Sequence, residues 1–191
     1  VRGFKGQLEI VPSSSDVLKV SGKKIDGGRF DQWKFQVRKK QNTVEVLVKG
    51  PSESEDWNKI RENKVPSFNL VVVAPARPLE IFWSQGKVVS QSWKSDLSVQ
   101  MTEGNIVLEK GVGRFKAQLI KGKVQVKNHK GDLELQTYKG QVFLDDIKGS
   151  LKINNFSANY SVKNITGSTD LKNHSGSMTL KKNNGFVQFH N

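Results

Sequence analysis

Apolar and polar residues alternate along most of the chain after residue 66, and a small residue interrupts the alternation at a fixed interval. From Gly104 to Gly185 every ninth residue is glycine, with Ala158 as the one exception. Large apolar side chains stand two and four positions later, as at Leu133 and Leu135. Period-two alternation predicts β-strands with one buried face. A unit of nine residues cannot form its own core, so the repeat predicts a solenoid of stacked units.

Each unit also carries a turn. The residue seven positions after the glycine is mostly large, and we expect it to be buried at the corner, as for Ile120, Tyr138, Ile147, Phe156 and Ile165. A short amide residue often precedes it, where a left-handed backbone is expected, as at Asn128, Asn155, Asn164 and Asn173. The glycine supplies a second conformation that branched residues resist.

The organisation changes near residue 66. Residues 1–66 hold irregular alternating runs separated by turn-rich segments, which predict an N-terminal cap of antiparallel β-strands. Within this region, the polar segment 50–66 could hold a short helix around 56–61. Residues 67–191 form the predicted β-solenoid, a β-helix or β-roll, so the fold class is all-β.

The number of units in one coil determines which side chains meet. If two units make a coil, residues 18 apart stack, and charges then alternate in the column Lys116, Glu134, Lys152 and Asp170. Opposite charges on neighbouring strands contribute ~0.2–1 kcal/mol per pair. The same coil stacks Lys121 on Lys139 and Lys130 on Lys148, which a triangular coil of three units would partly separate. We favour two units, with three as the alternative.

Two motifs carry a resemblance to a known family. A strand with a proline step, Leu70-Val71-Val72-Val73-Ala74-Pro75, is followed by tandem units such as Gly104-Asn105-Ile106 and Gly131-Asp132-Leu133. In these features the chain resembles the putative-adhesin family of bacterial β-strand-repeat domains of unknown function, relatives of the head GIN domain. The resemblance implies an exported β-helical or β-roll domain with a role in surface adhesion. This chain departs from the family in being strongly basic.

The charge points to an anionic partner. Lysine and arginine number 31 against 18 acidic residues, a net charge of +13, and such a field attracts anionic surfaces. The candidate polyanion-binding residues near the unit boundaries and the C-terminal end are Lys110, Lys121, Lys130, Lys139, Lys148, Lys163, Lys172, Lys181 and Lys182. The ligand would be an anionic glycan, lipopolysaccharide or a lipid surface. The alternative is that these lysines only maintain solubility and protect strand edges.

Other partners and chemistries find less support. Nucleic acid is disfavoured because no outward row of aromatic residues is expected on which bases could stack. Cysteine is absent, and we expect His129 and His174 to be packed, hydrogen-bonded corners. Asp146 is expected to replace a corner asparagine, and Asp145 to belong to a charge column. We therefore expect no catalytic residue, cofactor or metal site.

Apolar residues also stand at nominally outward positions. Val89, Val107 and Phe143 share one column of a two-unit coil, and a partner or the cap could cover them. The chain begins at Val1 without an initiator methionine, so we expect that a leader has been removed, with trimming of the sequence as the alternative. No apolar stretch is long enough for a membrane span, and the family resemblance implies a periplasmic, outer-surface or secreted location.

The sequence favours a non-enzymatic, adhesin-like binding module of the bacterial envelope, monomeric rather than weakly oligomeric. A self-assembling structural solenoid is the alternative, and a carbohydrate-active β-helix enzyme is a third hypothesis.

Overall fold

The computed structural model describes residues 1–26, 33–40, 43–49 and 66–190, and within these ranges every regular element is a β-strand. No helix among them is long and apolar enough to cross a membrane. The helix expected around 56–61 lies outside the described residues. The strands are β1 (Arg2–Ser13), β2 (Lys19–Asp26), β3 (Lys34–Lys40), β4 (Thr43–Lys49), β5 (Ser67–Pro75), β6 (Leu79–Gln91), β7 (Leu97–Glu109), β8 (Phe115–Lys130), β9 (Leu133–Lys148), β10 (Leu151–Thr166), β11 (Thr169–Ser175), β12 (Met178–Asn184) and β13 (Val187–His190).

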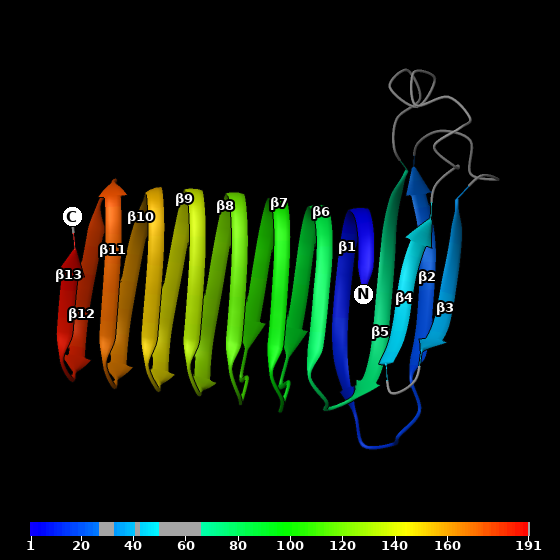
Figure 1. Cartoon of the computed structure of the whole chain (residues 1–191), viewed down its shortest axis with the longest axis horizontal. Coiled ribbons are helices and arrows are strands. Elements are labelled where there is room, and N and C mark those ends of the chain that lie inside the picture. The colour runs from blue at the N-terminus through cyan, green and yellow to red at the C-terminus, as the bar shows by residue number, and fades with distance from the viewer. Residues whose placement is uncertain (27–32, 41–42, 50–65, 191) are drawn as a thin grey trace.

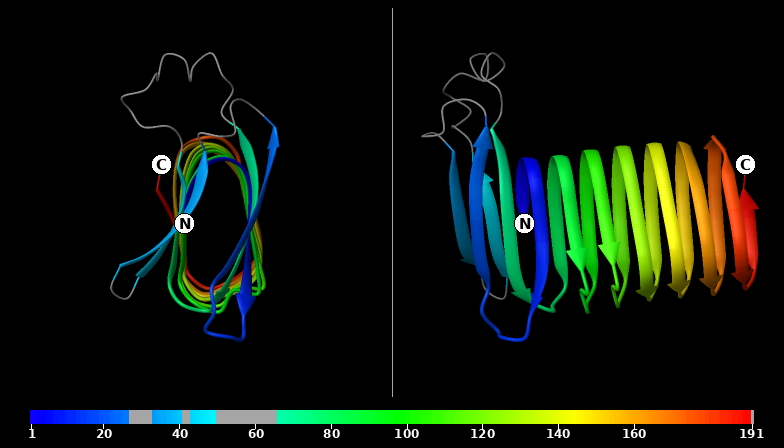
Figure 2. Two further views of the ribbon diagram at one scale, coloured as in Figure 1. Left: turned by 90° about the vertical axis from the view of Figure 1, so that its right-hand side faces the viewer. Right: turned by 180° about the vertical axis from the view of Figure 1, so that it is seen from behind.

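From β6 onward the chain winds into a solenoid of parallel strands (Figure 1). Leu133 of β9 pairs with Leu151 of β10, and the same offset of 18 residues relates β6 to β7, β7 to β8 and β8 to β9. The coil is therefore built from two nine-residue units, which confirms the two-unit prediction. Seen along its axis, each coil is a flattened oval (Figure 2).

Two narrow edges join the flat sides of the oval. At the upper edge of Figure 1 strands β8, β9 and β10 continue over the bend, whereas at the lower edge one strand ends and the next begins. We define the upper edge as residues 100–104, 118–122, 136–140, 154–158 and 172–176. The lower edge comprises residues 109–114, 127–132, 145–150, 163–168 and 181–186.

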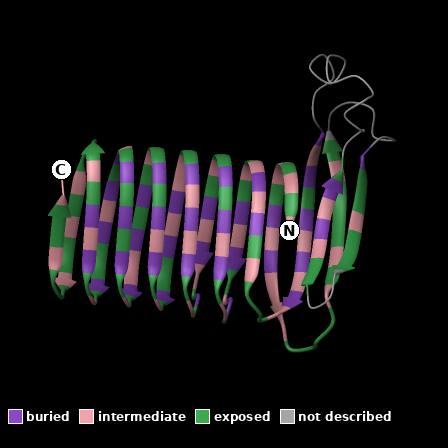
Figure 3. Ribbon diagram, in the orientation of Figure 1, coloured by how far each residue is buried: buried purple, intermediate pink, exposed green. Residues whose placement is uncertain are grey.

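The core fills the interior of the coils, and burial alternates along the strands (Figure 3). Leu135 of β9 is 0% exposed, and its column neighbours Ala117 and Ile153 are also buried. Burying one such leucine contributes ~1.5–3 kcal/mol. One coil alone would leave these side chains open at both ends, so the coils stabilise one another.

The glycine columns allow the coils to approach closely at the edges. Gly140 has a φ of 144°, and a Cβ at this position would lie 1.8 Å from the carbonyl oxygen of Gly122 in the preceding coil. The backbone conformation and the lack of space both exclude a side chain there. The period of nine is thus a steric requirement of the stack.

The two edges differ in their turns, which corrects the expectation that every corner buries its large residue. At the lower edge one residue of each coil is left-handed, namely Ser92, Lys110, Asn128, Asp146, Asn164 and Lys182. The next side chain then turns inward. His129, Ile147 and Ile165 are buried as expected, and Trp93 is buried at the equivalent place of an earlier coil. At the upper edge no residue other than glycine has a positive φ among those described. Consequently Thr137 and Asn155 point inward, whereas Ile120, Tyr138 and Phe156 are exposed.

The N-terminal strands combine a cap with one further coil. The pairs β2–β5 and β3–β4 are antiparallel, as expected for the cap. Strand β1 differs, because it is parallel to both β5 and β6 and aligns Gly6 with Gly86. Strand β1 therefore belongs to the solenoid stack, although the sequence predicted that the solenoid begins only at residue 67.

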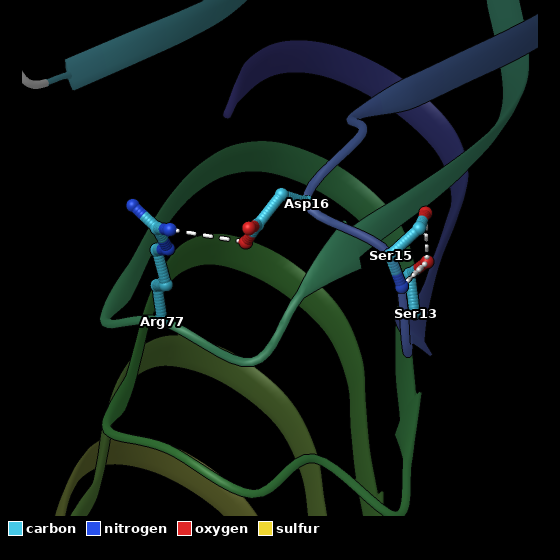
Figure 4. Close-up of polar contacts among 4 residues, drawn as sticks. All are labelled: Ser13, Ser15, Asp16 and Arg77. Atoms are coloured by element: carbon cyan, nitrogen blue, oxygen red, sulfur yellow. Dashed lines mark hydrogen bonds and ion pairs between the residues drawn. The ribbon is translucent and has the colours of Figure 1, made fainter.

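A surface ion pair lies where the cap meets the solenoid. Arg77 Nη2 donates to Asp16 Oδ1 at 3.0 Å, and the backbone amide of Ser15 donates to Ser13 Oγ at 3.1 Å (Figure 4). The arginine and aspartate side chains are 72% and 85% exposed. Pairs this exposed contribute little to stability, so strand pairing holds the cap in place.

Candidate functional site

All nine candidate lysines are exposed, and the structure divides them between the two edges. Lys121, Lys139 and Lys172 lie on the upper edge, whereas Lys110, Lys130, Lys148, Lys163, Lys181 and Lys182 lie on the lower edge. They do not converge on one site. They form two rows that run along the solenoid on opposite edges.

The edges contain stacked like charges beside opposite ones. Glu103 is in register with Lys121 at the upper edge, and Asp145 lies between Lys127 and Lys163 at the lower edge. Lys121 is in register with Lys139, and Lys130 with Lys148. On one flat side, Lys116 Nζ lies 3.1 Å from Glu134 Oε1.

Carboxylate partners for the nine lysines are scarce. Lys121 Nζ lies 2.9 Å from Glu103 Oε1, and this hydrogen bond raises the pKa of Lys121. Within the described ranges, none of the other eight forms an ion pair.

A solvent-open groove of about 780 Å³ follows the upper edge from the cap. Amide side chains line it along the solenoid, namely Gln100, Gln118, Gln136 and Asn154. Ile120, Tyr138 and Phe156 line it beside these amides, and Arg2, Phe4 and Lys49 line it at the cap. No described residue that lines the groove carries a carboxylate.

The amides form a column that gives the groove one hydrogen-bonding side chain in every coil. Gln100, Gln118, Gln136 and Asn154 are in register on β7 to β10, and Lys172 continues their column on β11. Gln118 Nε2 donates to Gln136 Oε1 at 3.0 Å. Each amide offers donors and acceptors, so the column retains capacity for an external ligand after this internal bond.

Beside the amides runs an outward row of large residues, which corrects the expectation that no such row exists. The ring centroids of Tyr138 and Phe156 are 4.8 Å apart with planes at 2°, and His174 stacks on Phe156 at 4.9 Å and 23°. Because the rings stack along the solenoid axis, each covers the face of its neighbour and directs an edge to solvent. The sequence shows the 18-residue spacing of Tyr138, Phe156 and His174, but it does not show that this turn lacks a left-handed residue, so the outward direction of the row could not be predicted.

The histidines and the paired aspartates have separate environments. His129 is buried near Phe115 and burial lowers its pKa, whereas His174 is exposed, contrary to expectation. His190 Nε2 lies 3.4 Å from Asp170 Oδ1. Asp146 takes the left-handed position as expected, and Asp145 accepts a 2.7 Å hydrogen bond from Asn164 Nδ2. Among the described residues no three histidine or acidic side chains gather into a potential metal site.

The candidate partner face, Val89, Val107 and Phe143, is an apolar column that Gln125 interrupts. Registers place Val89, Val107, Gln125 and Phe143 in consecutive coils. The ammonium group of Lys123 lies 4.4 Å from the centroid of the Phe143 ring, and the two valines are half-buried. A partner for this face stays a prediction.

Comparisons with known proteins include a structural similarity to a solved structure. No family model matches the chain, and no curated protein matches it. The crystal structure of a putative cell adhesion protein from Clostridium sporogenes is similar to it at 13% sequence identity and a TM-score of 0.41, over 98% of this chain and 89% of that one.

Proposed function

We propose that this β-solenoid is a non-enzymatic, adhesin-like module of the bacterial envelope or cell surface that attaches to anionic polymers or surfaces through its edges. The observation that carries the proposal is the stacking of like charges there. Lys130 and Lys148 occupy neighbouring strands at the lower edge, at a strand spacing of roughly 4.8 Å. Like charges placed opposite each other on neighbouring strands destabilise a sheet. An anionic ligand would relieve this repulsion on binding.

The charges of one flat side also support attachment through the edges, because they are paired with one another. Lys116, Glu134, Lys152 and Asp170 alternate in sign along one column, and Lys116 and Glu134 form an ion pair. This column is neutral as a whole. Within the solenoid, the lysines without carboxylate partners lie largely at the two edges, and an extended anion would meet their charge there.

The groove favours binding over hydrolysis. A glycoside hydrolase normally needs two carboxyl groups flanking the scissile bond. The described lining of the upper-edge groove provides amides, hydroxyls, apolar groups and two cations, without a carboxylate. These groups can hold a polymer but lack the usual acid and base for cleaving it.

Binding to immobilised dextran sulfate and to neutral dextran, each at low and high salt, tests this function. The protein should bind only the sulfated polymer and lose affinity at high salt, because exposed charges are screened over ~8–10 Å near physiological ionic strength. Replacing Lys130 and Lys148 with serine should weaken binding more than replacing the exposed cap residues Lys19 and Lys23, which removes the same charge. Equal losses from the two variants, or no binding at any salt concentration, would contradict the proposal.

A further inference from the structure

We propose that the upper-edge groove binds one extended acidic polysaccharide chain that lies along the solenoid axis and contacts one coil per sugar ring. The inference rests on the proposed function, because both require an anionic ligand. It adds a specific path for the chain and a class of polymer. The path runs from the cap, near Arg2 and Lys49, across the coils that carry the amide column.

The repeat distance of the groove favours a sugar polymer. Neighbouring coils are separated by roughly 4.8 Å, which is close to the length of a pyranose ring in an extended chain. Each coil from Gln100 to Asn154 therefore presents one amide to each successive ring. A side-chain amide can donate to and accept from the vicinal hydroxyl groups of a sugar. An extended polypeptide advances only ~3.3 Å per residue and would drift out of register.

The lateral order of side chains explains how the chain would be held. Across β9 the outward side chains are Gln136, then Tyr138, then Lys139, with the inward Thr137 between the first two. A chain lying over the ring row would have amides on one side and ammonium groups on the other. The edges of Tyr138 and Phe156 would support its apolar C–H groups, while Lys139, just outside the groove lining, would face its acidic groups. Lys121, in the same column, is paired with Glu103.

The charge of the lining favours an acidic polysaccharide over a neutral one. Arg2 and Lys49 line the groove, no described lining residue is acidic, and Lys172 continues the amide column. The guanidinium of Arg2 lies 4.8 Å from the centroid of the Phe82 ring, which holds this cation against the groove wall.

The ring stack disfavours single-stranded nucleic acid. Binding of bases depends on free aromatic faces. Tyr138 and Phe156 lie parallel at 4.8 Å and cover each other, so a base cannot enter between them.

The test uses oligogalacturonides, which carry one carboxylate per ring, and their methyl esters, which have the same backbone without the charge. Binding to the full chain should strengthen with oligomer length and level off once the oligomer spans the coils from Gln100 to Asn154. The methyl esters should bind at least tenfold more weakly. Replacing both Gln118 and Gln136 with alanine should weaken acid binding about tenfold, since two hydrogen bonds are lost.

The matched control replaces Gln125 and Gln141, two amides of the other flat side, with alanine and should leave affinity unchanged. Melting curves check that all variants are folded. If oligogalacturonide affinity falls with Lys130→Ser and Lys148→Ser but not with the groove variants, this inference is wrong while the proposed function stands. If single-stranded DNA or phosphatidylglycerol vesicles bind more tightly than the oligogalacturonide at equal charge, the sugar assignment is wrong. If no polyanion binds at low salt, both proposals are wrong.

Discussion

Tyr138 and Phe156 lie one coil apart at the upper edge with their rings parallel, and their centroids are 4.8 Å apart. They are 57% and 46% exposed, so the contact belongs to the surface of the solenoid. The backbone register brings the two residues into the same position of successive coils. The ring stack therefore follows from the coil length of 18 residues.

The stack should contribute measurably to stability despite its exposure. A double-mutant cycle of Tyr138→Ala and Phe156→Ala should give a coupling free energy of ~0.5–1.5 kcal/mol, the range for aromatic pairs. Chemical denaturation of the four proteins measures it. A coupling near zero would mean that the two rings stand side by side without interacting.

Gly140 should tolerate no side chain, because its φ is positive, whereas Ala158, in register with it on β10, has no positive φ and accommodates its methyl group. Gly140→Ala would place a methyl group against the Gly122 carbonyl at a φ of 144°. We expect a loss of at least ~1–3 kcal/mol in the free energy of unfolding. The neighbouring exposed residue provides the control, because Gln141→Ala should change stability little. Equal stability of the two variants would show that the coils can separate at this edge without cost.

The strand register can be tested at two adjacent residues of β9. Leu135 is fully buried, and Leu135→Ala should reduce the free energy of unfolding by ~2–5 kcal/mol through lost burial and a cavity. Gln136 is exposed, and Gln136→Ala should change stability little. Similar losses of melting temperature in the two variants would contradict the assigned inward and outward faces.

Buried His129 should make stability depend on pH. Its pKa is lowered in the folded protein by burial, whereas the unfolded chain titrates near the ordinary value of about 6.5. The unfolded state therefore binds more protons as the pH falls below that value, and stability decreases. His129→Ile, which copies Ile147 of the next coil, should reduce the loss of melting temperature between pH 7 and pH 5.

Much of this fold could be predicted from the spacing of its residues. The glycine period, the strand alternation and the charge column containing Lys116 and Glu134 all depend on stacking between neighbouring coils, and each is visible in the sequence. The upper-edge turn could not be predicted in the same way. Asn155 occupies the same place in its unit as Asn164, yet Asn155 is buried and only Asn164 is left-handed. A nine-residue unit does not distinguish the two turns of its coil.

The position of β1 and the groove escaped prediction for a related reason. Gly6 lies 80 residues before Gly86 in the chain, and their alignment arises because β1 inserts between β5 and β6. No local pattern marks such an insertion. The groove in turn needs the amide column, the ring row and the cap side chains together, and these meet only once the strands are stacked.

The most direct test of the binding site is to follow the side-chain amide signals of the ¹⁵N-labelled protein by NMR as a short oligogalacturonide is added. If the ligand lies in the upper-edge groove, the signals of Gln100, Gln118, Gln136 and Asn154 should shift together and saturate, while those of Gln125 and Gln141 on the other flat side stay in place. Lysine signals of the lower edge should change little at physiological salt. Shifts confined to the lower edge, or saturation without any change in the four groove amides, would contradict the upper-edge groove as the binding site.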